Sequence, residues 1–380
     1  MALGVDTKRL RHVRRVGSLA VAGTPSQLRN AQLAPTECSF RMPVWVEVGI
    51  GCRAQIRRVG IDRNSHGSER RLSVEEQGSP LYERWMRHLL LGPHGIRSPW
   101  RVMAAIALFK AFTFVLSTVL VSSPSVSAWL RSAPLGGLLT PGLLLLGEGT
   151  RTAAALLVGL AMARLEDRTF SDYRIPWSET LGKRLWQGVP LGLGMLALLM
   201  SSLHLFRVVS FVYQGLELST VLRNGALYGI GYLLVAFFEE ASFRGYMQTT
   251  METEFGFWPS AVVLSILFGA IHLQNSGESH FGVAMAGFFG LLAAFSVLRT
   301  GSIWFAVGLH AAWDWAQSFV YGVPNSGVVA QGHVWSCSVH GPNWLTGGSV
   351  GPEGSLLVLP VLLLLALAIH LLFPARRSNS

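Results

Sequence analysis

The sequence predicts an all-α, polytopic integral membrane protein with about eight transmembrane helices. Half of its 380 residues are hydrophobic, only 14% are charged, and the mean hydropathy is +0.40, a balance typical of membrane proteins. Apolar runs of membrane-spanning length recur from Trp100 onward, separated by short loops that carry charges, Gly or Pro. Ionisable residues stand inside these runs, which predicts catalytic groups in the bundle interior.

The apolar runs give eight predicted spans. They cover residues 100–122, 142–164, 186–209, 221–248, 258–275, 281–298, 302–322 and 355–373. Basic residues gather on one side of this array: before the first span, between the second and third, and after the sixth and eighth. By the positive-inside rule we expect both termini in the cytoplasm and the loop 323–354 outside. The expected location is a bacterial cell membrane.

The chain divides into three predicted regions. Residues 1–98 form a basic N-terminal region that we expect to be largely disordered, residues 99–374 the membrane domain, and residues 375–380 a cytoplasmic tail. Residues 1–101 hold 17 of the 31 Lys and Arg but only 8 of the 21 Asp and Glu, so they carry nearly all of the net charge. Two interpretations of the N-terminal region stand: a cytosolic tail touching anionic lipid, or sequence translated from a misassigned start upstream of Met86.

The basic charge does not indicate nucleic-acid binding, because it lies in the tail and no recognised binding motif accompanies it. The three cysteines, Cys38, Cys52 and Cys337, have neither CxxC nor zinc-ligand spacing, so a disulfide framework is not expected. The sequence shows no internal repeat and no inverted pair of interrupted helices, which argues against a transporter.

Two adjacent carboxylates inside the fourth span are the first candidates for chemistry. Glu239 and Glu240 occur in Phe-Phe-Glu-Glu-Ala-Ser-Phe-Arg-Gly, where an uncompensated charge is costly. On a helix Glu240 and Arg244 are four residues apart with the acid first, the favourable orientation for an ion pair. Glu239 points about 100° away and has no local cation, which suits a general base. A Glu-Glu-Arg cluster that only fixes helix packing is the structural alternative.

Two histidines in later spans complete the candidate site. His272 follows Phe268 by four residues and His310 precedes Asp314 by four, so each pair shares a helix face. At a rise of 1.5 Å per residue, Glu239, His272, His310 and Asp314 lie roughly 12–20 Å from the cytoplasmic surface. We therefore expect the polar groups of three helices to meet at one level, although His272 taken alone is more readily interpreted as a satisfied core histidine.

Two carboxylates and two histidines in a dry site suit activation of a water molecule for attack on a carbonyl, with the remaining groups steadying the oxyanion. They also suit a divalent metal such as zinc, whose ligands would be Glu239, His272 and His310. The sequence has no HExxH motif, and the residues alone leave both schemes open. Serine, cysteine and aspartyl protease chemistry are disfavoured, because Ser242 lacks a GxSxG setting, no span contains cysteine, and Asp314 is the only aspartate in a span.

Together these motifs resemble the signature of the CPBP family of CAAX-processing and bacteriocin-processing intramembrane endopeptidases, which includes the type II CAAX prenyl endopeptidases. The motifs are Glu239-Glu240-xxx-Arg244, Phe268-xxx-His272 and His310-xxx-Asp314, and the stretch Arg299-Thr-Gly-Ser-Ile-Trp304 is similar as well. The resemblance covers roughly residues 100–373. It implies that Glu239 and His272 activate the hydrolytic water, while Glu240 and Arg244 support the site.

The resemblance also implies that His310 and the residue at position 314 stabilise the oxyanion. Position 314 is often Asn in the family and is Asp here. An ionised Asp has no proton to donate. Asp314 is therefore expected to be protonated, to orient His310, or to lie near a cation.

We therefore expect an intramembrane endopeptidase that uses a Glu- and His-activated water, with no cofactor and with zinc as the alternative. Its partners would be membrane lipids and a peptide or protein substrate, lipid-modified or membrane-anchored, and no nucleic acid. The alternative function is a non-proteolytic membrane immunity or scaffold protein that binds a peptide or partner in the same pocket.

Overall fold

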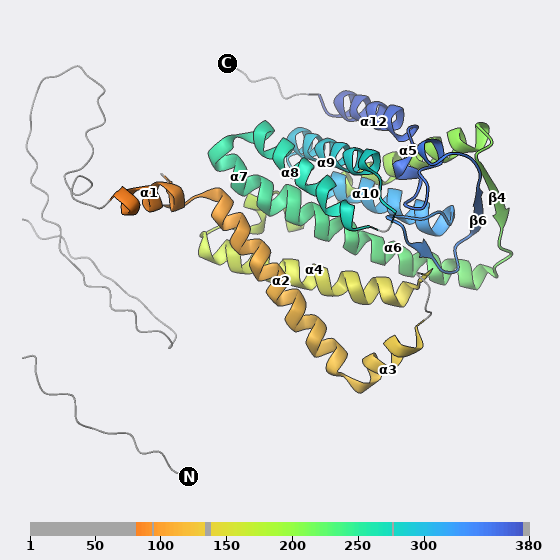
Figure 1. Ribbon diagram of the computed structural model, residues 1–380, viewed down its shortest axis with the longest axis horizontal. Helices are drawn as coiled ribbons and strands as arrows, with labels where there is room; N and C mark the ends of the chain where they lie inside the picture. Colours follow the sequence, from red (N-terminus) through yellow and green to blue (C-terminus); the bar gives the residue numbers. More distant parts are fainter. Residues whose placement is uncertain (1–80, 93–94, 134–137, 276, 375–380) are drawn as a thin grey trace, which may run out of the picture. The chain divides into compact units, whose positions relative to one another are not determined.

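The computed structural model describes residues 81–92, 95–133, 138–275 and 277–374. These residues form helices joined by short loops, with three two-stranded sheets among the loops (Figure 1). The predicted all-α polytopic membrane fold is confirmed. Residues 1–80 of the predicted N-terminal region lie outside the described residues. The last part of that region contains α1 (Leu81–Leu90). The predicted tail, 375–380, lies outside them as well.

Six helical segments of the described residues are long and apolar enough to cross a membrane. They are α2 (Ser98–Ser122), α4 (Pro141–Leu165), α5 (Lys183–Leu205), the run Leu218–Phe255, the run Phe257–Gln274 and α9 (His280–Thr300). The two other predicted spans are shorter helices: α10 (Trp304–Trp315), continued by the π-helix η5 (Ala316–Val320), and α12 (Val358–Leu372). Length and composition therefore confirm six of the eight predicted spans and do not confirm the count of eight.

The predicted fourth span is longer than expected. α6 (Leu218–Glu240) continues through the π-helix η3 (Ala241–Met247) into α7 (Gln248–Phe255), so the helix ends at Phe255 rather than at residue 248. The π-helix η3 begins directly after Glu240. π-helical turns are uncommon and often mark functional positions.

Local sequence signals set several helix ends. Thr140 caps α4, because its hydroxyl accepts a hydrogen bond from the Leu143 amide at 3.2 Å just before Pro141. Gly301, with φ of 76°, ends α9 in the left-handed region. Gly256, with φ of 78°, separates α7 from α8 (Phe257–Ile271). A 3-10 turn, η4 (His272–Gln274), follows α8.

The loops at one end of the bundle pair through short strands. β4 (Val209–Tyr213) runs antiparallel to β6 (Trp335–Val339), and β3 (Leu138–Leu139) runs parallel to β5 (Val329–Ala330). The predicted outer loop 323–354 is therefore structured, and it also contains α11 (Asn343–Thr346) and η6 (Pro352–Gly354).

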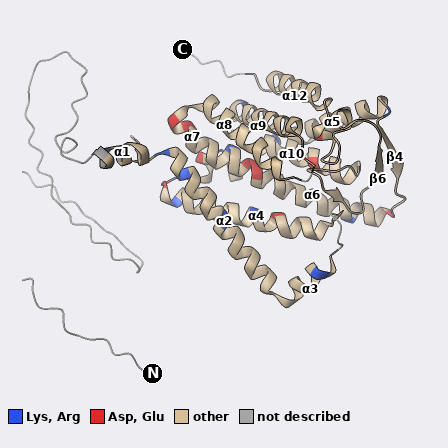
Figure 2. Ribbon diagram, viewed as in Figure 1, with Lys and Arg blue, Asp and Glu red and all other residues tan. Residues whose placement is uncertain are grey.

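The opposite end of the bundle holds α1, α7 and a small hairpin of β1 (Leu91–Gly92) and β2 (Gly95–Ile96) (Figure 1). Two 3-10 turns, η1 (Phe170–Tyr173) and η2 (Trp177–Glu179), follow α4, and the short helix α3 (Pro124–Ser132) follows α2. Lys and Arg gather at the end where α2 begins (Figure 2).

α10 is the central helix, packed against α5, α6 and α9 and almost entirely buried. α5 approaches it through glycines: a Cβ on Gly188 or Gly192 would lie 2.2 Å from the carbonyl oxygens of Phe305 and Leu309, respectively. Small residues allow helix backbones in membranes to come this close. The contact between α5 and α10 thereby fixes the helix that carries His310.

We expect Gly192→Ala to destabilise the fold, because the added methyl group would overlap the Leu309 carbonyl and force α5 away from α10. Overpacking of this kind costs about 1–3 kcal/mol, which would lower the melting temperature of the purified protein in detergent. Gly194→Ala on the same helix is the matched control, since a Cβ at Gly194 meets nothing within 4 Å. Equal melting temperatures for the two variants would contradict the close approach of the helices.

Candidate active site

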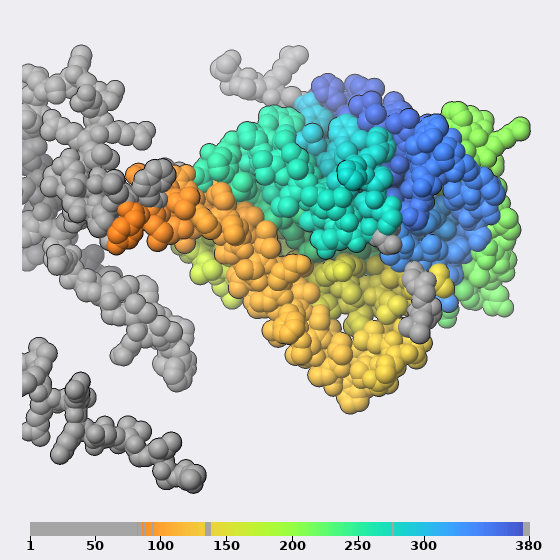
Figure 3. Space-filling model, in the orientation of Figure 1, coloured from red at the N-terminus to blue at the C-terminus, as the bar shows by residue number. Residues whose placement is uncertain are grey.

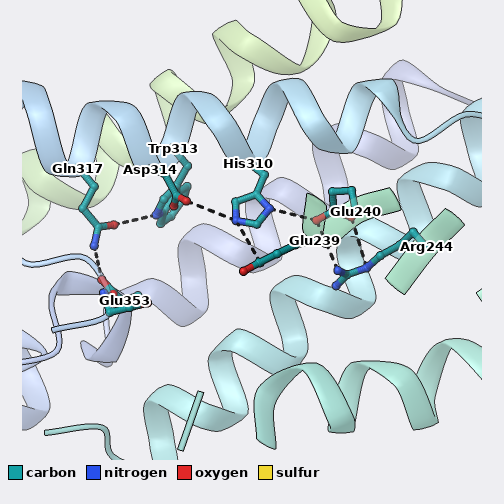
Figure 4. Close-up of polar contacts among 9 residues, drawn as sticks. Glu239, Glu240, Arg244, His310, Trp313, Asp314, Gln317 and Glu353 are labelled. Carbon is teal, nitrogen blue, oxygen red and sulfur yellow. Dashed lines mark hydrogen bonds and ion pairs between the residues drawn. The ribbon is translucent and has the colours of Figure 1, made fainter. Parts of the chain in front are cut away.

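The two adjacent carboxylates of α6 face His310 on α10 (Figure 4). Glu240 Oε1 lies 3.1 Å from His310 Nδ1, and Glu239 Oε2 lies 3.8 Å from His310 Nε2. The same Nε2 is 3.5 Å from Asp314 Oδ2. His310 therefore stands between the acids of α6 and the acid one turn further along α10.

Glu240 is the most deeply buried member of this group, with no exposed surface. Arg244 approaches both of its oxygens at 3.4 Å, through Nη1 and Nε, as the four-residue spacing predicts. Because an ionised carboxylate only accepts hydrogen bonds, the His310 nitrogen that faces Glu240, Nδ1, donates. Nε2 is thereby left facing Glu239 and Asp314.

Arg244 is held in place by two further helices. Its guanidinium carbon lies 4.3 Å from the ring centroid of Phe268 on α8, within the range of a cation–π contact. Gly290 on α9 leaves the room that the guanidinium occupies, since a Cβ at Gly290 would lie 2.6 Å from Arg244 Nη2. Four helices therefore meet at the pair of Glu240 and Arg244.

Phe268 also fixes His272, four residues later. His272 Nδ1 lies 2.7 Å from the Phe268 carbonyl oxygen, and the two ring centroids are 4.9 Å apart. A carbonyl only accepts, so Nδ1 donates, and in the neutral ring Nε2 keeps the lone pair that a base needs. Among the described residues, His272 forms no hydrogen bond or ion pair with the other five predicted site residues.

A cavity of about 910 Å³ brings the groups together. Glu239, His272, His310 and Asp314 line it, whereas Glu240 and Arg244 lie behind its wall. The remaining walls come mainly from α2, α4, α6 with η3, α8 and α9, and the loop 323–354 contributes as well. The four lining residues can touch a bound molecule, while Glu240 and Arg244 can act only through their neighbours.

The predicted metal ligands do not form a metal-binding cage in this arrangement. Across the described ranges, no group of three or more His, Cys, Asp or Glu side chains converges to hold an ion. Of Glu239, His272 and His310, only Glu239 and His310 come within ion-pair distance of each other, and zinc sites use at least three protein ligands. The three predicted ligands are therefore not gathered around one point in this arrangement.

A hydrogen-bonded chain extends the site toward the loop 323–354 (Figure 4), and the sequence did not predict it. Trp313 Nε1 donates to Gln317 Oε1 at 2.9 Å, and Gln317 Nε2 donates to Glu353 Oε2. The Ser326 amide donates to Glu353 Oε1 at 2.7 Å. Glu353 is the only acidic residue between 323 and 354, and that isolation is the signal that could have found it.

Three further ionisable residues of the cavity wall were also not predicted. They are Lys110 on α2 and Glu148 and Arg151 on α4, and the last two form an ion pair. All three lie inside predicted spans, so the reasoning that selected Glu239 applies equally to them.

Residues 224–316 match the family model for type II CAAX prenyl endopeptidases, Rce1-like. This segment is similar to an Rce1-like domain. It contains all six predicted site residues, and it confirms the resemblance to the CPBP family that the motifs predicted. The match to this family of CAAX-type endopeptidases covers less than half of the chain. No curated protein matches the chain.

Arg244→Met should destabilise the protein strongly, because it leaves the Glu240 carboxylate buried without its cation. Breaking a buried pair in this way costs about 3–5 kcal/mol, measurable by thermal unfolding in detergent. Glu252→Gln is the matched control: it breaks the Arg174–Glu252 ion pair, whose side chains are 22% and 26% exposed, and should cost about 0–1 kcal/mol. Similar losses in the two variants would contradict the role of Arg244.

Glu353 should make the stability of the fold depend on pH. Burial raises the pKa of its carboxyl from 4.5 to about 8, against the opposing hydrogen bonds from Ser326 and Gln317. The folded chain therefore keeps a proton that the unfolded chain has released, and the stabilisation, fully present below pH 4.5, is lost as the pH rises through 8. We expect the wild-type melting temperature to fall over this window relative to that of Glu353→Gln, whose amide does not ionise. Parallel curves for the two proteins would contradict this assignment.

Proposed function

We propose that this chain is an intramembrane endopeptidase that hydrolyses a peptide bond with a water molecule activated by Glu239 and His272. The observation that carries the proposal is one cavity among the membrane helices, lined by Glu239, Asp314, His272 and His310. Ionisable groups are costly in this setting, and they generally mark functional sites. The Rce1-like domain, which holds all four residues, supports the same conclusion.

In this mechanism Glu239 is the general base. Its carboxylate takes a proton from water while the water oxygen forms a bond to the substrate carbonyl carbon. The Nε2 lone pair of His272 accepts a hydrogen bond from the same water and orients it. Glu239 then passes its proton to the departing amine as the carbon–nitrogen bond breaks.

His310 is proposed to stabilise the oxyanion. Glu240 engages its Nδ1 proton, and the acids near Nε2 favour a doubly protonated ring that donates from Nε2. Losing one such donor typically costs about 10²–10³ in rate. Asp314, at 3.5 Å from Nε2, acts by orienting His310, and Glu240 and Arg244 are positioning residues.

The substrate is proposed to enter from the bilayer past α2. Of the six membrane-length helices in the described residues, α2 is the least buried, and it forms part of the cavity wall. Figure 3 shows the surface hollowed where α2 and α3 stand away from α4. This route suits a membrane-anchored or lipid-modified peptide, with the termini of the enzyme on the cytoplasmic side as the basic residues predict.

Glu239→Gln tests the general base. In liposomes that contain a library of membrane-anchored peptides, the variant should cut at least about 100-fold more slowly than wild type, because general bases contribute about 10²–10⁴. Its melting temperature should not change. Glu252→Gln, which alters a carboxyl outside the cavity, should cleave at the wild-type rate.

If Glu239→Gln cleaved the peptides at the wild-type rate, Glu239 would not be the general base. A wild-type protein that cuts no peptide, yet retains one as well as Glu239→Gln does, would favour the non-proteolytic immunity or scaffold function. A chelator should leave cleavage unchanged in the metal-free scheme. Activity lost with chelator and restored by zinc would overturn that scheme.

A further inference from the structure

The loop 323–354 brings one amide side chain into the cavity wall. Asn325 lines the cavity, and its Nδ2 is enclosed without an acceptor at hydrogen-bond distance among the described residues. A buried donor that makes no hydrogen bond costs about 1–3 kcal/mol, and such groups are rare in native structures. The hydrolysis described above assigns no role to Asn325.

A tight turn fixes the backbone at Asn325. The Asn325 amide donates to the Val328 carbonyl oxygen at 2.9 Å, and the Val328 amide donates to the Asn325 carbonyl oxygen at 3.0 Å. The two residues between them, Ser326 and Gly327, have φ of 52° and 81°. Positive φ at both central positions is the pattern of a type I′ turn, so the chain reverses sharply just after Asn325.

The hydrogen-bonded chain through Glu353 anchors this turn (Figure 4). Gln317 Nε2, which also donates to Glu353, donates to the Pro324 carbonyl oxygen at 2.7 Å. On the other side of Asn325, the Ser326 amide donates to Glu353 Oε1 at 2.7 Å. Both neighbours of Asn325 are therefore tied to buried polar groups, and the turn is held against the helix that carries the site.

The Asn325 side chain faces Asp314 on that helix, closely enough for an amide–carboxylate interaction. Asp314 has one ion-pair contact among the described residues, with His310 Nε2 at 3.5 Å. No Lys or Arg of the described ranges lies within ion-pair distance of it. Because an amide carries no charge, it can direct a carboxylate without neutralising it. Asn325 is thus a donor placed beside a carboxylate that lacks a cation of its own.

We propose that Asn325 is a positioning residue of the hydrolysis, whose amide donates to Asp314 and keeps the Nε2 proton of His310 available to the oxyanion. Without this donor, the Asp314 carboxylate would turn fully toward Nε2 and compete with the oxyanion for its proton. Catalytic hydrogen bonds often tighten only as the substrate binds, and a small movement of the Asn325 side chain would close this one. The assignment rests on the proposed function, because it acts through the role proposed for His310.

The first test compares Asn325→Ala with Asn343→Ala. Asn343 belongs to the same loop, but it is exposed and lies outside the cavity. With the membrane-anchored peptide that the wild type cuts fastest, Asn325→Ala should lower kcat by up to about 10²-fold, the loss that a small misplacement of a reacting group can cause. KM should not change, because Asn325 acts on Asp314 and not on the bound peptide. Asn343→Ala should keep the wild-type kcat and KM.

A double-mutant cycle distinguishes a positioning role from a structural one. If Asn325 acts through Asp314, adding Asn325→Ala to Asp314→Ala should lower kcat no further. Losses that multiply in the double variant would overturn the proposal, and so would a wild-type kcat in Asn325→Ala. A melting temperature that falls in Asn325→Ala, together with a raised KM, would overturn it as well, because that result would indicate a structural role.

A binding measurement separates the role of Asn325 from the proposed function. Two uncleaved analogues of the peptide are used: a phosphinate, which is tetrahedral and anionic at the scissile position, and a planar ketomethylene. The wild type should bind the phosphinate at least about 10²-fold more tightly, as expected for a mimic of the transition state. Asn325→Ala should lose most of this preference, and Asn343→Ala should keep it.

The outcomes of the binding measurement reject different claims. A preference that Asn325→Ala retains, in a wild type that cuts the peptide, would reject only the role of Asn325. A wild type that cuts no peptide and shows no preference would reject the proposed function, and the role of Asn325 with it.

Discussion

The buried carboxylate of Glu240 is the constraint on which the site depends. It accepts from Arg244 on its own helix and from His310 on α10, so one group without exposed surface fixes the relation between two helices. Arg244 in turn requires the Phe268 ring and the space at Gly290, which bring α8 and α9 to the same place. A buried charge that loses a partner is strongly destabilising, and the four helices are therefore held in register by electrostatics as well as by apolar packing.

The buried pair of Glu240 and Arg244 also distinguishes the residues that position the site from the residues that can react. Glu240 and Arg244 form an ion pair, Glu240 also contacts His310, and both residues stay behind the cavity wall. Glu239, the adjacent residue, projects into the cavity with a fifth of its side chain exposed. The adjacent residues Glu239 and Glu240 therefore have different roles, because consecutive side chains of a helix point about 100° apart. His272 is also oriented by its own helix, since its Nδ1 donates to the Phe268 carbonyl oxygen and its Nε2 stays available for the reaction.

The sequence predicted what depends on local pattern. Apolar runs located the helices, and four-residue spacings located the pairs Glu240–Arg244 and His310–Asp314. Contacts between helices leave no such pattern: nothing in the sequence indicates that Gly290 makes room for a guanidinium. Glu353 is 36 residues beyond Gln317, and so distant a partner has no periodic signal. Lys110, Glu148 and Arg151 satisfied the same criterion as Glu239, but no neighbouring motif drew attention to them.

The π-helical turns carry a consequence for how this chain tolerates change. Each of η3 and η5 widens the helix soon after an acidic motif, which moves every later side chain around the axis by about one residue's rotation, roughly 100°. The positions before and after a π turn therefore belong to two different helical wheels. Loss of one residue between 241 and 247 would let the π turn revert to an α-helical turn, which keeps the direction of α7 and leaves Glu254 facing Arg97 and Ser98, its partners at the start of α2. The same loss in a regular α-helical stretch would rotate every later side chain by about 100°.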